Sequence, residues 1–227
     1  MGATLEILDR KILVETLISH SLAYSFLSRV FYQAPDSELI ATLVANRLFD
    51  DWPMESEEPE TQAGLAMLRQ FCEVWDDSLL PSLKVDFARL FIGPDKLLAP
   101  PWESVYLSPD HLMFEKQTLE VRQAYKHFNM EAPIPGREPD DHIGLELRFV
   151  AHLCNIGLNA VETERIDQLT LVTDAIRDFL KSHLTLWSGE FAKRVVIHGQ
   201  TDYYRGTAKL LQGCVETSKR AFQLVGE

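Results

Sequence analysis

Two carboxylates and a histidine stand together in the stretch GREPDDHIGLELRFV, residues 136–150, where a strongly apolar run begins. Asp140, Asp141 and His142 are residue types that bind metal ions, act as general bases, cap helices or line binding grooves. Asp141 and His142 are adjacent, so on a helix their side chains point about 100° apart and do not readily chelate one ion. A metal-dependent hydrolase that uses Asp141, His142 and His111 stays open as an alternative function.

The beginning of this apolar run also fits a helix N-terminus. Pro139 favours extended backbone in the residue before it, and an Asp that follows can accept hydrogen bonds from the free N–H groups of the first turn. A carboxylate there also complements the helix dipole. His142 and Glu146 are four residues apart and share a helix face, but the HExxH pattern of zinc hydrolases is absent. We therefore expect Asp140 to cap a helix.

No other segment carries a catalytic pattern. The sequence has neither a GxSxG nucleophile elbow nor the glycine-rich loops that cradle nucleotide phosphates. An odd number of widely spaced cysteines among apolar neighbours indicates free thiols in a reducing compartment: Cys72, Cys154 and Cys214. We therefore predict no catalytic residues, no metal site and no cofactor, in a protein that is not an enzyme.

Two aromatic motifs precede the Asp-Asp-His stretch. In FARLFIGP the apolar side chains recur at the helical spacings of three and four, which is most often a core stripe: Phe87, Leu90 and Phe91. In PPWESVY, Trp102 and Tyr106 lie in a proline-rich segment, and large aromatic side chains on a rigid surface segment commonly anchor a peptide or ligand. Glu103 adds a charge that can meet an arginine.

Every long segment has helical periodicity, and no convincing alternating strand is present. Asp36 or Ser37 is placed to cap the second helix. Gly93-Pro94 is placed to end the predicted helix over 80–92. Residues 94–107 lack a period and are predicted to be an ordered, non-helical surface segment. The predicted helices are 4–32, 37–49, roughly 60–78, 80–92, 108–128, 140–158, and roughly 162–181, 183–198 and 202–225.

These helices predict an all-α fold, a single bundle of about nine to ten helices. Apolar residues lie on nearly every face of 140–158, which places that helix in the middle of the bundle. A Pro/Gly-rich hinge at 129–139 separates an N-terminal helical part, 1–128, from a C-terminal part, 140–227, within one compact unit. A hinge there permits domain swapping, so the expected state is a monomer or a domain-swapped dimer.

Charge and composition restrict the partners. The chain has 227 residues, is 46% hydrophobic and carries a formal net charge of −12. This charge argues against nucleic acid and against anionic membrane surfaces as partners, and favours a cationic ligand such as a basic peptide. No targeting peptide and no apolar run of membrane-spanning length is apparent, so we expect a soluble cytoplasmic protein.

Four motifs in order, FARLFIGP, PPWESVY, EPDDH and HLTLWSGEFAKRV followed by YYRGTAKLL, give the sequence a resemblance to a known family. It resembles the TorD/DmsD family, the system-specific chaperones of bacterial molybdoenzymes, also called redox enzyme maturation proteins. The family has a Glu-Pro-x-Asp-His run, which Glu138, Pro139, Asp141 and His142 match. The resemblance covers about 87–206.

The resemblance implies a non-enzymatic chaperone that binds the twin-arginine signal peptide and the body of a molybdoenzyme precursor, of the dimethyl sulfoxide or trimethylamine N-oxide reductase type. It would hold the precursor until the cofactor is inserted and before export by the Tat translocon; the translocon and cofactor-biosynthesis proteins are further partners of such a chaperone. Carried over by position, the peptide site comprises Phe87, Leu90, Phe91, Pro101, Trp102, Glu103, Tyr106, Glu138, Asp141 and His142. Asp141 and His142 would then edge this site.

Overall fold

The computed structural model describes residues 2–54, 57–94, 96–108, 113, 116–133 and 138–224. These residues form an all-α bundle and contain no β-strand, which confirms the predicted fold class. The helices are α1 Gly2–Tyr32, α2 Ser37–Ala45, α3 Pro59–Glu73, α4 Leu80–Phe87, α5 Glu103–Leu107, α6 Lys116–His127, α7 Ile143–Glu162, α8 Ile166–Phe179, α9 Thr185–His198 and α10 Asp202–Ala221. Shorter helical turns are Asp77–Leu79 (3-10), Ala88–Ile92 (π) and Leu180–Leu184 (π).

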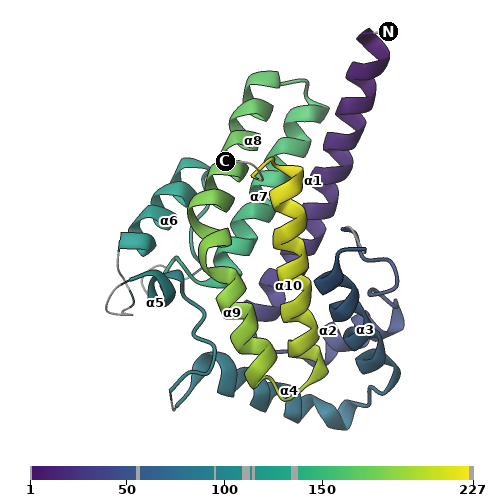
Figure 1. Ribbon diagram of the computed structural model, residues 1–227, viewed down its shortest axis with the longest axis vertical. Helices are drawn as coiled ribbons and strands as arrows, with labels where there is room; N and C mark the ends of the chain where they lie inside the picture. Colours follow the sequence, from purple (N-terminus) through teal and green to yellow (C-terminus); the bar gives the residue numbers. More distant parts are fainter. Residues whose placement is uncertain are drawn as a thin grey trace.

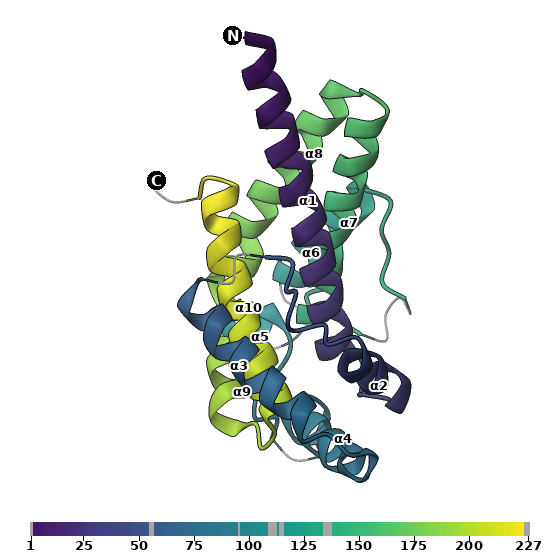
Figure 2. The same cartoon turned by 90° about the vertical axis from the view of Figure 1, so that its right-hand side faces the viewer.

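The long helices run roughly parallel to the long axis of the molecule (Figure 1). α1 packs along α7, and α10 packs against α3 and α9, so segments before and after residues 129–133 contribute to the same core. The small helices α5 and α6 lie beside the bundle, and the first turns of α1 project beyond the other helices at the end opposite α4 (Figures 1 and 2).

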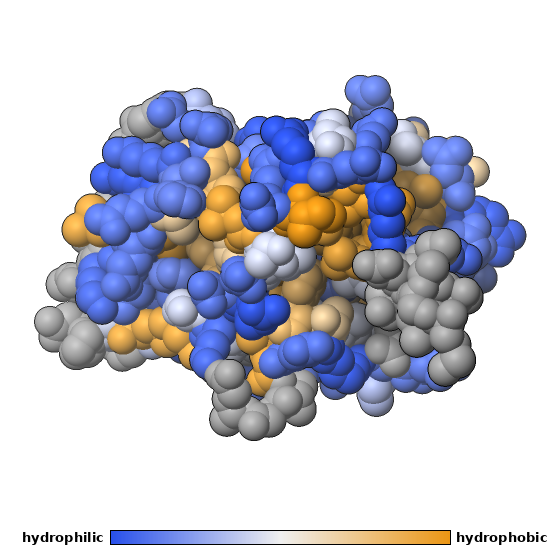
Figure 3. Space-filling view, turned by 90° about the horizontal axis from the view of Figure 1, so that it is seen from above, coloured by the Kyte–Doolittle hydropathy of each residue, from blue (hydrophilic) through white to orange (hydrophobic). Residues whose placement is uncertain are grey.

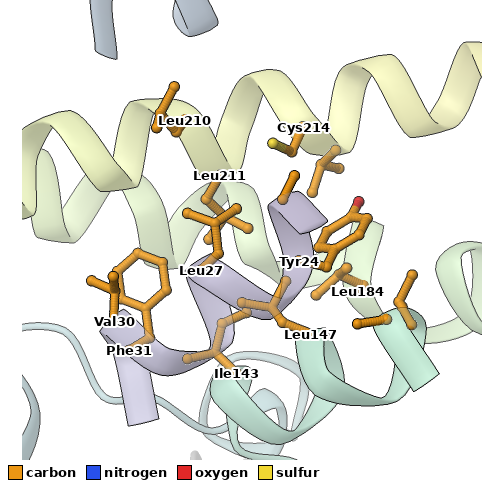
Figure 4. Close-up of a cluster of buried hydrophobic side chains, with 14 of the residues drawn as sticks. Tyr24, Leu27, Val30, Phe31, Ile143, Leu147, Leu184, Leu210, Leu211 and Cys214 are labelled. Carbon is orange, nitrogen blue, oxygen red and sulfur yellow. The ribbon is translucent and has the colours of Figure 1, made fainter. Parts of the chain in front are cut away.

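The centre of the core is built from α1, α7 and α10. Figure 4 shows Tyr24, Leu27 and Phe31 of α1 facing Leu147 of α7 and Leu211 of α10, and all five side chains are fully or almost fully buried. Burying apolar area of this kind is the main favourable contribution to folding. The prediction that the helix after Pro139 lies in the middle of the bundle is therefore confirmed, since α7 is buried on nearly every face.

Two predicted helix boundaries are confirmed. The N–H of Leu39 donates to the carboxylate of Asp36 at 2.8 Å, which makes Asp36 the N-cap of α2. The π-helical turn after α4 ends at Gly93, whose φ of 94° is readily adopted only by glycine.

Three local predictions differ from the structure. Residues 103–107 belong to the segment predicted to be non-helical, but they form α5. An N–H in the first turn of α5 donates to a carboxylate from a distant part of the chain, and periodicity does not reveal such a tertiary contact. The helices predicted to end near 181 and begin near 183 are joined without a break by the π turn Leu180–Leu184. α6 begins at Lys116, while Pro109 and Asp110, which were expected to start it, lie outside the described residues.

The upper end of the molecule has an apolar band through its centre with hydrophilic side chains on both sides (Figure 3). At this end, α1, α8 and the residues after α10 line a hollow of about 230 Å³ that includes Leu13, Thr173 and Phe222. In the part of the chain that the structure describes, no helix combines the length and the apolar character needed to span a membrane.

Candidate functional site

The PPWESVY and EPDDH motifs meet as two short extended segments. The N–H of Ile143 donates to the carbonyl of Pro101 at 2.7 Å, and the N–H of Glu103 donates to the carbonyl of Asp141 at 3.0 Å. Trp102 and His142 thereby form an isolated antiparallel bridge. The structure thus places the proline-rich segment directly against the beginning of α7.

His142, and not Asp140, caps α7. Its Nδ1 accepts the N–H of Gly144 at 3.0 Å, and its backbone is the last in extended conformation before the helix. Burial lowers the pKa of His142 to about 3, so the imidazole is neutral near pH 7 and Nδ1 is free to accept. The expectation for Asp140 was therefore wrong: two residues before the cap, its carboxylate instead pairs with Arg122, with Nε–O and Nη–O distances of 2.8 and 2.7 Å.

Asp141 is fully buried, and described donors occupy both of its carboxylate oxygens. Oδ2 accepts the N–H of Ser104 at 2.8 Å, in the first turn of α5, and Oδ1 accepts the hydroxyl of Thr118 at 2.7 Å, in α6. A carboxylate in this position satisfies a helix N–H that would otherwise be buried without a partner. Asp141 therefore joins three elements: the segment before α7, α5 and α6.

Beneath α5 lies a cluster of two glutamates, a histidine and a tryptophan. Nδ1–H of His183 donates to Glu103, 3.0 Å from Oε2, and Nε1–H of Trp187 donates to Oε2 of Glu146 at 3.2 Å. Both glutamate side chains have no exposed area. The cluster ties α5 to α7 and to the π turn that carries His183, and this turn brings the imidazole against Glu103.

The surroundings of the two glutamates favour a proton on Glu146. Burial, together with the charges of Glu103 and Asp141, raises the pKa of Glu146 well above its usual range, and burial also raises the pKa of Glu103. Oε1 of Glu146 receives no hydrogen bond from a described donor. A proton on Glu146 resolves this, because the carboxyl group then donates to the Glu103 carboxylate, which His183 also stabilises.

We expect Glu146→Gln to stabilise the protein at alkaline pH. The unfolded chain loses the Glu146 proton above about pH 4.5 while the folded chain keeps it, so stability is lost as pH rises towards the folded pKa. Glutamine does not ionise, still accepts from Trp187 and donates to Glu103. The gain in unfolding free energy over wild type should therefore grow steadily between pH 5 and 8 in urea titrations. Glu162→Gln, exposed on the same helix, is the control, and an equal gain there would contradict the assignment.

A small set of partly exposed side chains surrounds the buried His142. Nε1–H of Trp102 donates to Oε1 of Glu138 at 2.7 Å, and the rings of Trp102 and Tyr32 both lie edge-on to the imidazole, with centroid distances of 6.2 and 5.2 Å. We call Tyr32, Trp102 and Glu138 the Trp102 surface. Sequence reasoning missed Tyr32, because it ends the apolar pattern of α1 and nothing in its spacing connects it to His142.

The other predicted site residues lie away from this surface or beneath it. Tyr106 packs against Trp187 in a tilted arrangement with a centroid distance of 5.3 Å, and the guanidinium carbon of Arg194 lies over the Tyr106 ring, 5.3 Å from its centroid. The remaining members are buried: Phe87, Leu90, Phe91, Pro101, Glu103, Asp141 and His142. The aromatic stripe belongs to the core, where Phe91 packs against Phe31 and Phe191. The aromatic stripe is connected to the segment that carries Trp102 through a backbone hydrogen bond: the N–H of Ala99 donates to the carbonyl of Leu90 at 3.0 Å.

The described residues hold no group of three or more His, Cys, Asp or Glu side chains placed to bind a metal ion. His111, the third ligand of the hydrolase alternative, lies outside the described residues. His142 uses Nδ1 in the helix cap and Asp141 uses both oxygens in hydrogen bonds. In the structure, Asp141 and His142 therefore use these atoms to stabilise the fold.

The family model described as nitrate reductase delta subunit matches residues 55–193, a region that contains α5 and the two paired segments. The chain belongs to this family, that of the TorD and DmsD chaperones.

Individual relatives carry chaperone names. The chain is 30% identical over 184 residues to the Tat proofreading chaperone DmsD of Salmonella typhi, a match that covers 81% of each protein. It is 25% identical over 205 residues to the chaperone protein TorD of Shewanella pealeana, covering 87% of this chain and 86% of the relative. A crystal structure from Archaeoglobus fulgidus, assigned to a redox enzyme maturation protein, has the same fold with a TM-score of 0.51 and 19% identity; the match covers 85% of this chain and 93% of that one.

Proposed function

We propose that this protein is a cytoplasmic chaperone that binds the twin-arginine signal peptide of a molybdoenzyme precursor and releases the precursor for Tat export after cofactor insertion. The observation that carries the proposal is the similarity to Tat proofreading and TorD chaperones over more than four fifths of the chain. The enzymes whose precursors it serves are of the dimethyl sulfoxide or trimethylamine N-oxide reductase type. The protein acts by binding and has no turnover of its own.

The chemistry of the surface supports this proposal. A twin-arginine leader carries two arginines followed by an apolar stretch, so its receptor needs carboxylates next to exposed apolar groups. The Trp102 surface offers two aromatic rings and the carboxylate of Glu138, and the chain carries a net charge of −12 that attracts a cationic peptide. The buried members of the predicted site act by holding these groups in place.

Direct binding tests the proposal. Synthetic leaders of the two reductase types are titrated into the purified chain by calorimetry, each as a twin-arginine and a twin-lysine version. We expect saturable binding of a twin-arginine leader, and a weakening by about tenfold with lysine, which lacks the planar fork that pairs with a carboxylate. A folded protein that binds none of the leaders would refute the proposal. A stoichiometric transition metal in protein purified without chelator would instead support the hydrolase.

A further inference from the structure

A second surface, between α6 and α8, combines apolar side chains with carboxylates. It is a groove of about 360 Å³. Its apolar lining comes from Ala124, Phe128, Phe149, Leu171, Ala175 and Phe179. Asp174 and Asp178, one helical turn apart on α8, supply carboxylates, and no Lys or Arg is among the described residues that line the groove. We call this the α6–α8 groove.

Asp174 and Asp178 of the groove are exposed, whereas Glu138 of the Trp102 surface is only partly exposed and the carboxylates beneath that surface are buried. Asp178 is exposed and has neither a hydrogen bond nor an ion pair with any other described residue. Asp174 is exposed and is paired only with Arg177, its neighbour on the same helix, at 2.7 Å. Exposed pairs of this kind contribute little and are easily exchanged.

The carboxylates of the two paired segments are already engaged. Asp141 and Glu103 have no exposed area and accept hydrogen bonds from within the protein. Asp140 is paired with Arg122, and Glu138 accepts the indole N–H of Trp102. A guanidinium binds best when both oxygens of a carboxylate are available to its fork. Asp178 meets this requirement.

We propose that the α6–α8 groove binds the arginine-bearing segment of the twin-arginine leader. Asp178 pairs with a leader arginine, and the floor around Phe128, Leu171 and Phe179 receives the apolar side chains that follow it. The inference rests on the proposed function, because it takes the same leader as the occupant. The evidence for this occupant is complementarity: an apolar floor whose charged side chains at neutral pH are the carboxylates of Asp174 and Asp178 fits a cationic segment that continues into an apolar one.

A buried pair of side chains connects the groove to the backbone segment that carries Trp102. His183 lines the groove, and its Nδ1 lies 3.0 Å from Oε2 of Glu103, the residue that follows Trp102. In this proposal, a leader that extends from the groove to the Trp102 surface uses Trp102 as an aromatic anchor, and the groove is the part that selects arginine.

Charge reversal in the groove tests the inference. We expect Asp178→Lys to weaken binding of the twin-arginine leader by about tenfold, and Asp178→Asn to weaken it about threefold while reducing the preference for arginine over lysine leaders. Leu171→Arg, which places a cation among the apolar side chains, should weaken binding at least as much as Asp178→Lys. Asp167→Lys is the matched control, since Asp167 is exposed on the same helix and is not a lining residue of the groove. Circular dichroism verifies that each variant is folded.

The outcomes separate this inference from the proposed function. If the unmodified protein binds the leader and Asp178→Lys binds as Asp167→Lys does, within twofold, the groove is not the arginine site, whereas the chaperone function stands. If the unmodified, folded protein binds no leader, the proposed function fails first. An Asp178→Lys variant with selectively weakened binding and an unchanged melting temperature supports the groove.

Discussion

Asp141→Ala should lower the unfolding free energy by about 3 kcal/mol or more, because two buried donors lose their acceptor. The N–H of Ser104 and the hydroxyl of Thr118 point at the two carboxylate oxygens, at 2.8 and 2.7 Å, and Asp141 has no exposed area. Hydrogen bonds to a charged group contribute about 1.5–3 kcal/mol each, and a buried donor left without a partner carries the full desolvation cost.

Two further variants isolate the cause. Asp141→Asn should retain most of the stability, since its carbonyl oxygen accepts from Ser104 and its amide group donates to the Thr118 hydroxyl, which can reverse its role. Asp36→Ala removes the half-exposed N-cap of α2 and should cost only about 1 kcal/mol. Urea titrations followed by circular dichroism measure all three. An Asp141→Ala variant no less stable than Asp36→Ala would show that these hydrogen bonds contribute little.

The role of Asp141 in the structure differs from the role that the sequence implied. The resemblance carried by the EPDDH motif implied that Asp141 edges the peptide site. In the structure its carboxylate organises α5, whose N-terminal neighbour is Trp102. We therefore expect the Asn variant to discriminate arginine from lysine leaders as well as the unmodified protein does, because no oxygen of Asp141 faces the surface.

Sequence periodicity was sufficient for the long helices, though not for α5, and for those boundaries set by local contacts. Asp36 accepts from a residue three positions later and Gly93 has a positive φ, so both boundaries depend on a few neighbouring residues. The central position of α7 followed from the absence of a polar face.

Boundaries and site contacts that depend on tertiary structure could not be predicted. Either Asp140 or His142 has a suitable acceptor for the α7 cap, and what selects His142 is the pairing of its backbone with the segment around Trp102. Tyr32 reaches His142 only because α1 packs along α7. The partner of Glu103 is His183, 80 positions later, and periodicity carries no information on such contacts.

Trp102→Ala should weaken leader binding by roughly 2–4 kcal/mol, as the loss of an aromatic anchor typically does. The indole is partly exposed, its N–H is held by Glu138 at 2.7 Å, and its ring lies edge-on to His142, so it is fixed in orientation before any ligand arrives. A preorganised side chain loses little conformational entropy on binding. Folding stability should fall much less than for a buried tryptophan, whose replacement by alanine costs about 3–5 kcal/mol.

Trp75 supplies a matched control for this measurement. It is also partly exposed, follows the end of α3 and packs against Phe71 with a centroid distance of 5.3 Å, but belongs to neither the Trp102 surface nor the α6–α8 groove. Trp75→Ala should therefore bind the leader as the unmodified protein does, at a similar small cost in melting temperature. Leader affinities from calorimetry and melting temperatures from circular dichroism are compared for both variants. If Trp102→Ala keeps full affinity and melts far lower than Trp75→Ala, the indole is a structural side chain and the leader binds without it.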